Sequence, residues 1–380
     1  MKHYLNNAGA GTMSQQTLDV IIRHLKREIE IGAYVAAQEN KENIAKFYDA
    51  VKQCIHADRA DEIAFMDSAS RGLNMVVYGL QLKEGDTIVT LSTEFGTNLL
   101  ALYDYAKRAK LNLKIIQCDT QGKFDIVEIK KSLEKGAKAL YISQATAQGS
   151  IVNPVCKIGK LAKEYNAIYI VDGCQAVGQM PVNVNEMHCH AYITTGRKWL
   201  RGPRGTGFLY VRENTPIQAT QVDLASADLD IDFERNDIKG IVIRKDARRF
   251  ELWERSVASV LGLSEAINEY LKEDQKKIHS LIYQKANSIR KGVALNSAIQ
   301  IIGEAEATTG IVGFYLKNKE LEDVLRRNLM EASIGFSAMS DWDCPLGFPK
   351  CASTIFRLSP HFYTSDETID KAIEVISQLN

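Results

Sequence analysis

The strongest constraint on the fold is a pair of short hydrophobic runs, one ending at an acid and one ending near a lone lysine. Residues 167–171 read Ala-Ile-Tyr-Ile-Val and are followed by Asp172. Residues 191–195 read Ala-Tyr-Ile-Thr-Thr, and Lys198 follows three positions later. Short apolar runs bounded by glycine and proline are typical of buried strands. We therefore expect Asp172 and Lys198 at strand ends, where an open α/β sheet binds its ligands.

A carboxylate and a lysine amine in this arrangement suit the chemistry of pyridoxal phosphate. The lysine amine forms a Schiff base with the aldehyde of the cofactor, and the carboxylate keeps the pyridine nitrogen protonated. The ring can then accept electrons from a substrate carbanion. A structural acid and an ordinary surface lysine would explain Asp172 and Lys198 singly, but not the ordered string that runs to Gly207.

This string resembles the class V aminotransferase family of fold-type I pyridoxal phosphate enzymes, which includes cysteine desulfurases, isopenicillin N epimerases and ergothioneine carbon–sulfur lyases. The matching residues are 171–178 (Val-Asp-Gly-Cys-Gln-Ala-Val-Gly), 195–198 (Thr-Gly-Arg-Lys) and 202–207 (Gly-Pro-Arg-Gly-Thr-Gly). The resemblance implies an α/β fold with a large, mostly parallel seven-stranded sheet and a small α/β C-terminal domain. It also implies a homodimer that binds pyridoxal 5'-phosphate.

The chain is long enough for this two-domain arrangement. We expect an N-terminal arm and helix over 1–30, the large cofactor-binding domain over 31–258, a connecting helix over 259–291 and the small domain over 292–380. Residues 213–245 are acidic and irregular, and resemble a family segment that approaches the active site or the partner subunit. A solvated surface loop is the alternative for this segment.

Composition argues against several classes of partner. Lys and Arg together number 47, as do Asp and Glu, so nothing suggests a nucleic acid or an anionic membrane as partner. No run approaches the roughly 20 apolar residues of a membrane span, and the first residues lack the apolar core of a signal peptide. Seven scattered cysteines without a disulfide framework favour reduced thiols in a cytoplasmic enzyme.

The phosphate of the cofactor has candidate ligands in two places. Ser68, Ala69 and Ser70 follow a strand-like run and open a helix, where free backbone N–H groups favour a phosphate. Any strand-to-helix turn could look like this, but its place in the order of the family motifs favours a phosphate site. The resemblance also implies that Thr195 and Arg197 bind the phosphate. Arg197 replaces a histidine that is common in the family, and its planar fork of donors suits an anion.

Three further residues match positions around the cofactor ring. Phe95 stands where desulfurases carry a ring-stacking histidine, and a phenyl ring can stack but cannot transfer protons. The difference favours the epimerase-like and ergothioneine-lyase-like branches, although an ordinary core phenylalanine is the alternative. Thr146 and Gln175 match the residues that the family uses near the 3'-oxygen of the cofactor.

The resemblance implies substrate-binding residues in two segments. Arg357 matches the arginine that holds the α-carboxylate of an L-amino acid substrate, because two N–H donors fit two carboxylate oxygens. A strand arginine that points to solvent is the alternative. Asn7 and Ala8 match a small-residue segment that touches the same carboxylate, although a simple turn before a helix is also possible.

The specific reaction depends on Cys344, in the loop 340–347. This loop lies roughly where desulfurases carry the thiolate that takes sulfur from cysteine. A nucleophilic thiol needs exposure and a lowered pKa, whereas Asp341 and Asp343 would raise the pKa of Cys344. Cys351 is a weaker candidate.

We therefore expect a pyridoxal phosphate enzyme that cleaves a carbon–sulfur bond through a Lys198 Schiff base and a Cα carbanion, as a lyase or a desulfurase. An aminotransferase or an epimerase on the same scaffold is the alternative. A cofactor-free binding protein is the rival from another class, and the intact Asp172 and Lys198 argue against it. We expect no metal site at residues 188–190 (His-Cys-His), because neighbouring side chains of a strand point to opposite faces.

Overall fold

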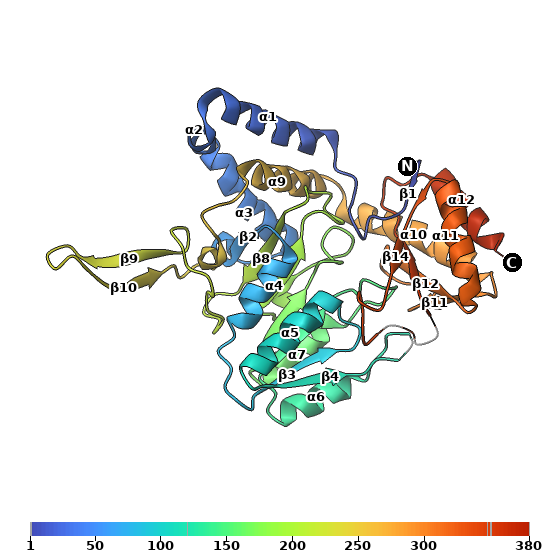
Figure 1. Ribbon diagram of the computed structural model, residues 1–380, viewed down its shortest axis with the longest axis horizontal. Coiled ribbons are helices and arrows are strands. Elements are labelled where there is room, and N and C mark those ends of the chain that lie inside the picture. The colour runs from blue at the N-terminus through green and yellow to red at the C-terminus, as the bar shows by residue number, and fades with distance from the viewer. Residues whose placement is uncertain (1, 120, 348, 350–351, 380) are drawn as a thin grey trace.

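The computed structural model describes residues 2–119, 121–347, 349 and 352–379, which form a large and a small α/β unit (Figure 1). The large sheet has the strand order β2-β8-β7-β6-β5-β3-β4. β8 is antiparallel to both of its neighbours, and the other pairs are parallel. The predicted seven-stranded, mostly parallel sheet is confirmed. Its strands are β2 (Ile63–Met66), β3 (Thr87–Leu91), β4 (Asn112–Ile116), β5 (Ala139–Ser143), β6 (Ile168–Asp172), β7 (Ala191–Thr195) and β8 (Gly207–Val211).

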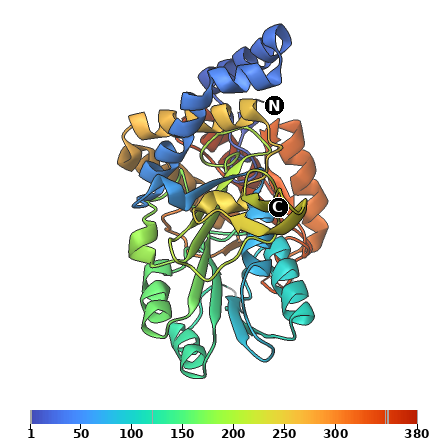
Figure 2. The same ribbon diagram turned by 90° about the vertical axis from the view of Figure 1, so that its left-hand side faces the viewer.

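The central strands are apolar on both faces because helices cover both faces of the sheet (Figure 2). Side chains alternate along a strand, so that Leu140 and Ile142 of β5 enter one core cluster while Ala139 and Tyr141 enter the other. The first face is covered by α3 (Lys41–Ile55), α6 (Ile126–Glu134), α7 (Val155–Glu164), α8 (Val184–Met187) and α9 (Val257–Lys272). The second face is covered by α4 (Ala69–Tyr78), α5 (Gly96–Arg108) and the 3-10 helix Ala247–Phe250.

One edge of the sheet gathers the predicted cofactor residues. The parallel strands β5, β6 and β7 end at Ser143, Asp172 and Thr195, and α4 and α5 begin beside that edge. In open α/β sheets this carboxyl edge is where ligands bind. Segments that lie more than a hundred residues apart in the sequence therefore meet at one place.

The small unit is an antiparallel sheet of order β11-β12-β15-β14, packed against helices. Its strands are β11 (Ile299–Ile302), β12 (Val312–Leu316), β14 (Ser337–Met339) and β15 (Ile355–Leu358), and its helices are α10 (Gln275–Ala294), α11 (Glu322–Glu331) and α12 (Asp366–Ser377). Two 3-10 turns, Ala60–Glu62 and Lys319–Leu321, precede β2 and α11. The N-terminal strand β1 (His3–Tyr4) pairs with β13 (Ile334–Gly335), so that the start of the chain joins the small unit.

The N-terminal helices protrude from the large unit (Figure 1). α1 (Gln15–Ile31) begins where the Ser14 hydroxyl accepts a hydrogen bond from the Thr17 N–H, and it packs against α9. The short helix α2 (Ala33–Glu39) leads into α3. Among the described residues, the structure contains no helix that is both long and apolar enough to cross a membrane.

Two segments differ from the sequence-based expectation. The helical stretch 259–291 consists of α9 and α10, because the Asp274 side chain accepts a hydrogen bond from the Lys277 N–H and begins a new helix. Residues 213–245 contain an antiparallel hairpin, β9 (Ala227–Asp232) and β10 (Asp237–Ile243). Alternating acidic and apolar residues in β9 suit a strand. The proposed domain boundaries remain predictions.

The close packing of α7 against the end of α8 gives a test of the fold. A Cβ atom at Gly159 would lie 1.8 Å from the Met187 carbonyl oxygen. We expect Gly159→Ala to lower the free energy of unfolding by about 1–3 kcal/mol, measured by denaturant titration. Gly240→Ala is the matched control, since its Cβ would meet no heavy atom within 4 Å. Equal losses in both variants would contradict the steric explanation.

Candidate active site

A cavity of about 410 Å³ lies at the carboxyl edge of the large sheet. Its lining comes from the β2–α4 and β3–α5 turns, the ends of β5, β6 and β7, and the loop after β7. The structure thus brings together most of the predicted cofactor residues. Those that line the cavity are Ser68, Ala69, Ser70, Phe95, Asp172, Gln175, Thr195, Arg197 and Lys198.

One side of the cavity is suited to an anion. Ser68 is the N-cap of α4, and its hydroxyl accepts a hydrogen bond from the Arg71 N–H at 3.2 Å. The N–H groups of Ala69 and Ser70 have no partner within the helix, because the first N–H groups of any helix lack one. Arg197 also lines the cavity, and its guanidinium donates to the Gly9 carbonyl.

Arg204 is a second cation in the cavity lining, and we did not predict it as a site residue from the sequence. It lies close enough to Arg197 to lower the pKa of that guanidinium, although burial has the larger effect. Two arginines that repel each other favour an anion between them. The Thr195 hydroxyl donates to the Thr206 carbonyl at 3.2 Å, and it would have to rotate to donate to an anion on this side.

Lys198 has the properties of a reactive amine. Burial lowers the pKa of Lys198 to about 8, Arg197 acts in the same direction, and Cys174 and Asp172 oppose the change. Among the described residues, the structure shows no hydrogen bond or ion pair to its Nζ. The neutral, nucleophilic form of this amine is therefore far more populated near neutral pH than that of an ordinary lysine.

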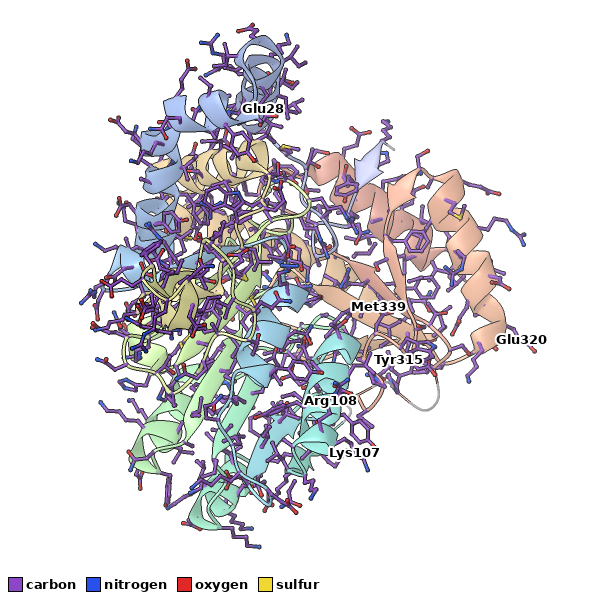
Figure 3. All side chains as sticks on the ribbon, turned by 60° about the vertical axis from the view of Figure 1, so that its left-hand side comes forward. Glu28, Lys107, Arg108, Tyr315, Glu320 and Met339 are labelled. Carbon is purple, nitrogen blue, oxygen red and sulfur yellow. The ribbon has the colours of Figure 1, made fainter. Side chains whose placement is uncertain are left out.

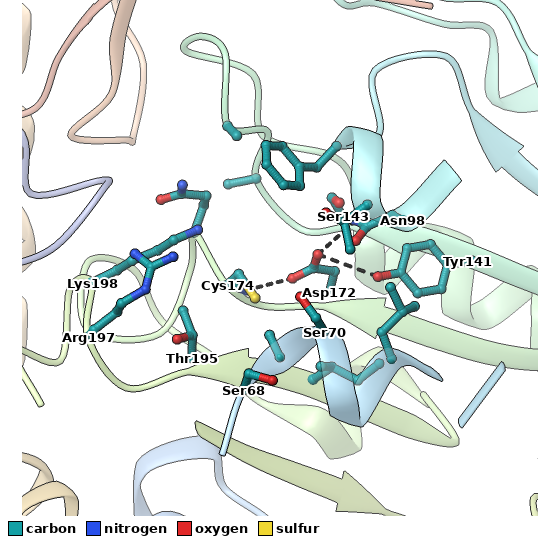
Figure 4. A pocket seen from close by; sticks show the side chains of 18 of the residues that line it. Ser68, Ser70, Asn98, Tyr141, Ser143, Asp172, Cys174, Thr195, Arg197 and Lys198 are labelled. Atoms are coloured by element: carbon teal, nitrogen blue, oxygen red, sulfur yellow. Dashed lines mark hydrogen bonds between the residues drawn. The ribbon is translucent and has the colours of Figure 1, made fainter. Parts of the chain in front are cut away.

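The carboxylate of Asp172 is held by three donors (Figure 4). Its Oδ1 accepts from the Cys174 N–H at 2.8 Å. Its Oδ2 accepts from Asn98 Nδ2 at 2.9 Å and from the Tyr141 hydroxyl at 3.4 Å. In Figure 4, Asp172 lies between Lys198 on one side and Asn98 and Tyr141 on the other. We did not predict Asn98 and Tyr141 as partners of Asp172. The sequence offered one indication, because Asn98 is a polar residue in the same segment as Phe95.

The other predicted ring contacts differ in their surroundings. Phe95 is 37% exposed and lines the cavity. Gln175 also lines it, but its amide donates to the Ala8 carbonyl at 3.1 Å and accepts from Trp199 Nε1 at 2.9 Å. Thr146 lies just behind the cavity lining: its buried hydroxyl donates to the Gly149 carbonyl at 3.5 Å, its neighbours line the cavity, and its contact with the cofactor stays a prediction.

Arg357 is buried beside this cavity. It is 6% exposed, so the alternative of a solvent-facing strand arginine is wrong. Nη1 donates to the carbonyl of Ala147, a residue of the cavity lining, at 3.0 Å, and Nη2 lies 3.5 Å from Asn6 Oδ1. Nε has no partner, and burial lowers the pKa of Arg357 to about 10. No carboxylate forms an ion pair with it among the described residues, which leaves a buried cation ready for an anionic ligand.

Asn7 and Ala8 have hydrogen-bond partners within the protein, and their expected contacts with a substrate stay predictions. The Asn7 amide donates to the Ser359 carbonyl at 2.7 Å and accepts from the Tyr363 hydroxyl at 2.5 Å, which satisfies both ends of the side chain. The Ala8 N–H donates to the Ser359 hydroxyl. These residues tie the N-terminal segment to the small unit, and Asn6 is the member of that segment that reaches Arg357.

Cys344 lies outside the cavity. Its side chain is fully buried in a small cluster whose other members are Ile151, Ile302, Met339 and Ile355; Figure 3 labels Met339, where the small sheet faces the large unit. Burial raises the pKa of the Cys344 thiol to about 12, and Asp343 and Asp341 add to the effect. A buried, protonated thiol is a poor nucleophile, so this geometry disfavours the predicted catalytic role. Cys351 lies outside the described residues.

The His-Cys-His segment has local structural partners. His190 Nδ1 accepts from the Tyr169 N–H at 3.0 Å, and Cys189 Sγ donates to the Val184 carbonyl at 3.7 Å. In the part of the chain that the structure describes, no three His, Cys, Asp or Glu side chains are grouped to hold a metal ion.

Known proteins resemble this chain in sequence and in fold. The chain is 23% identical over its whole length to a probable cysteine desulfurase of Methanothermobacter thermautotrophicus, covering 88% of that protein. An apo cysteine desulfurase of Thermococcus onnurineus superposes with a TM-score of 0.88 at 24% identity, covering 99% of this chain and 94% of the other. The cystine C–S lyase C-DES, in complex with its product cysteine persulfide, superposes with a TM-score of 0.88 at 20% identity, covering 100% and 98%.

The family model for class-V aminotransferases matches residues 3–371, nearly the whole chain. The cavity has the parts that the cofactor of this family needs: a neutral-prone lysine, an anchored carboxylate and an anion-binding side. The chain therefore belongs to the class-V aminotransferase family and is an enzyme that depends on pyridoxal 5'-phosphate.

Proposed function

We propose that this enzyme cleaves the carbon–sulfur bond of an L-amino acid by β-elimination. When bound, the cofactor withdraws electrons from Cα of an attached amino acid and so makes its α-proton acidic. The observation that carries the choice of reaction is the position of Cys344, which is buried away from the cavity.

Different residues around the cavity would hold different parts of the cofactor. Lys198 would hold its aldehyde carbon and Asp172 its ring nitrogen, and Phe95 would stack on the ring. The N–H groups of Ala69 and Ser70, at the N-terminus of α4, would bind its phosphate together with Arg197. Further contacts would come from Ser68, Gln175 and Thr195. This division is supported by the opposite charges of the two sides of the cavity.

Substrate binding would depend on Arg357. Its unpartnered Nε offers a hydrogen bond to the α-carboxylate of an amino acid, and the buried charge would be neutralised by that carboxylate. Lys198 is the base best placed to take the α-proton, because its pKa near 8 lets it both accept and return a proton. As the proton leaves Cα, the electron pair of the C–S bond departs with the sulfur.

A lyase needs no protein thiol, whereas a desulfurase transfers sulfur to one. Cys174 is the cysteine of the described cavity lining, and burial raises its pKa well above the ordinary value, with Asp172 adding to the effect. Neither Cys174 nor Cys344 is prepared as a thiolate. The relatives named as cysteine desulfurases keep the desulfurase reaction as the second candidate.

Product analysis separates these reactions. With S-methyl-L-cysteine we expect pyruvate, ammonia and methanethiol, and we expect Cys344→Ser to keep the rate within about twofold, because a buried thiol takes no part. Lys198→Ala should abolish turnover. Alanine and protein-bound sulfur formed from L-cysteine, and lost in Cys344→Ser, would establish a desulfurase instead. A racemised substrate or an amino-group transfer would indicate the epimerase or aminotransferase alternative.

The lowered pKa of Lys198 predicts how the apoenzyme takes up its cofactor. Only the neutral amine attacks an aldehyde, so we expect the initial rate of covalent attachment to be half-maximal near pH 8 and to level off about one pH unit higher. Borohydride reduction followed by peptide mass spectrometry measures attachment at Lys198. A rate that keeps rising to pH 10 would show an unperturbed lysine, and Lys198→Ala controls for attachment elsewhere.

We also propose a cytoplasmic homodimer. The described cysteines are free, which supports a reducing compartment. The dimer is supported by an apolar stripe on α1 that the described part of the chain leaves largely exposed. Its members recur at a spacing that places them on one face of the helix, and they are 37–87% exposed: Leu18, Ile22, Leu25 and Ile29.

The stripe gives a test of the oligomeric state. We expect light scattering to give twice the mass of one chain for the natural protein. The double variant Ile22→Glu/Ile29→Glu should give the mass of one chain, because it places charges in an apolar interface. Val127→Glu, an equally polar change at an exposed site on α6, is the control. An unchanged dimer in the double variant would show that α1 is not the interface.

A further inference from the structure

Glu94 is a buried carboxyl group that the proposed chemistry does not use. It lies in the turn between β3 and α5 and is fully buried, whereas its neighbour Phe95 lines the cavity. Burying a carboxyl group is costly unless its oxygens are hydrogen-bonded. Its partners therefore indicate what it does.

Both oxygens of Glu94 point towards the carboxyl edge of the sheet. Oε1 accepts from the Ser143 N–H at 2.7 Å, and Oε2 accepts from the Ser143 hydroxyl at 2.5 Å. Ser143 is the last residue of β5 and is paired in register with Asp172 on β6. Glu94 is thus tied to the strand end next to Asp172.

Asn98 connects the two carboxyl groups. Its Nδ2 lies 3.1 Å from Glu94 Oε2 and 2.9 Å from Asp172 Oδ2, and a primary amide has one N–H for each. The reversed amide would turn its oxygen towards two carboxyl oxygens, so the two acids define a single orientation of Asn98. Asn98 in turn fixes the position of Asp172 Oδ2.

The network carries negative charge without a paired cation. Among the described residues, no Lys, Arg or His lies within ion-pair distance of Glu94 or Asp172. Burial raises the pKa of Glu94 to about 7; Ser143 opposes this shift and Asp172 adds to it. The other groups that face Asp172 are the Tyr141 hydroxyl and the Cys174 and Lys198 side chains.

We propose that Glu94 is a positioning residue: acting through Asn98, it orients the Asp172 carboxylate and strengthens the hold of that carboxylate on the protonated ring nitrogen of the cofactor. The inference rests on the proposed role of Asp172. Glu94 itself touches neither cofactor nor substrate. Its effect should therefore pass entirely through Asn98.

The test is a double-mutant cycle. Glu94→Gln keeps the size of the side chain but places an N–H donor opposite the N–H donor of Asn98. Asn98→Leu removes the amide that joins Glu94 to Asp172. We expect each single variant to weaken binding of pyridoxal 5'-phosphate about tenfold, measured by equilibrium dialysis of the apoenzyme. We expect kcat to fall about tenfold while KM for the amino acid, which Arg357 sets, stays unchanged. The double variant should lose no more cofactor affinity and kcat than the more strongly affected of the two single variants.

Thr90→Val is the matched control. Thr90 is buried on β3, and its hydroxyl donates to the Tyr141 carbonyl at 2.8 Å, so the variant loses one hydrogen bond between the same strands without touching the carboxyl groups. Cofactor affinity and kcat should stay within about twofold of the natural enzyme. Equal losses in Thr90→Val would show a general packing effect and overturn the proposal, as would losses in Glu94→Gln and Asn98→Leu that multiply.

Asp172→Asn distinguishes the two levels of the proposal. If Asp172→Asn binds the cofactor and turns over normally, the role of Asp172 itself is wrong. If Asp172→Asn fails while Asn98→Leu keeps normal affinity and kcat, only the positioning role is wrong. Asn98→Leu carries this comparison alone if Glu94→Gln does not fold, as judged by thermal unfolding of the apoenzyme.

Discussion

The fixed carboxylate of Asp172 is the interaction on which the site depends. It stands at the end of β6, where the neighbouring parallel strands β5 and β7 place Ser143 and Thr195 at the same edge. A strand end is rigid because its backbone hydrogen bonds continue into the sheet, whereas a loop residue keeps more freedom. The cavity is therefore built outwards from β6, with the α4 turn on one side and the loop of Lys198 on another.

Two desolvated cations give the cavity its chemical character. Lys198 is partly buried and Arg357 is buried, and desolvation lowers the pKa of each. Removing a cation from water costs free energy that a bound anion can offset. This desolvation favours two kinds of ligand. A carboxylate pairs with the arginine, and an aldehyde reacts with the neutral form of the lysine amine.

The sequence predicted the site residues at strand ends better than those in loops. The strands that end at Asp172 and Thr195 were predicted from hydrophobic runs, since burial between two helical layers requires such runs. Thr146 and Asn7 were matched to family positions in irregular segments, and both side chains turn to backbone carbonyls of the protein instead. The direction of a loop side chain depends on its nearest hydrogen-bond partners, which a linear pattern does not contain.

By itself, the sequence determined the strands that end at Asp172 and Thr195, the lysine and acid pair and the family, because these follow from hydrophobic runs and from a contiguous motif. Only the tertiary structure decided that Cys344 is enclosed in an apolar cluster, that Arg357 is buried beside the cavity and that Asn98 joins Glu94 to Asp172. Burial and contact across more than seventy residues arise when separate elements pack together. The reactivity of a thiol or an amine follows from that packing, since desolvation shifts its pKa.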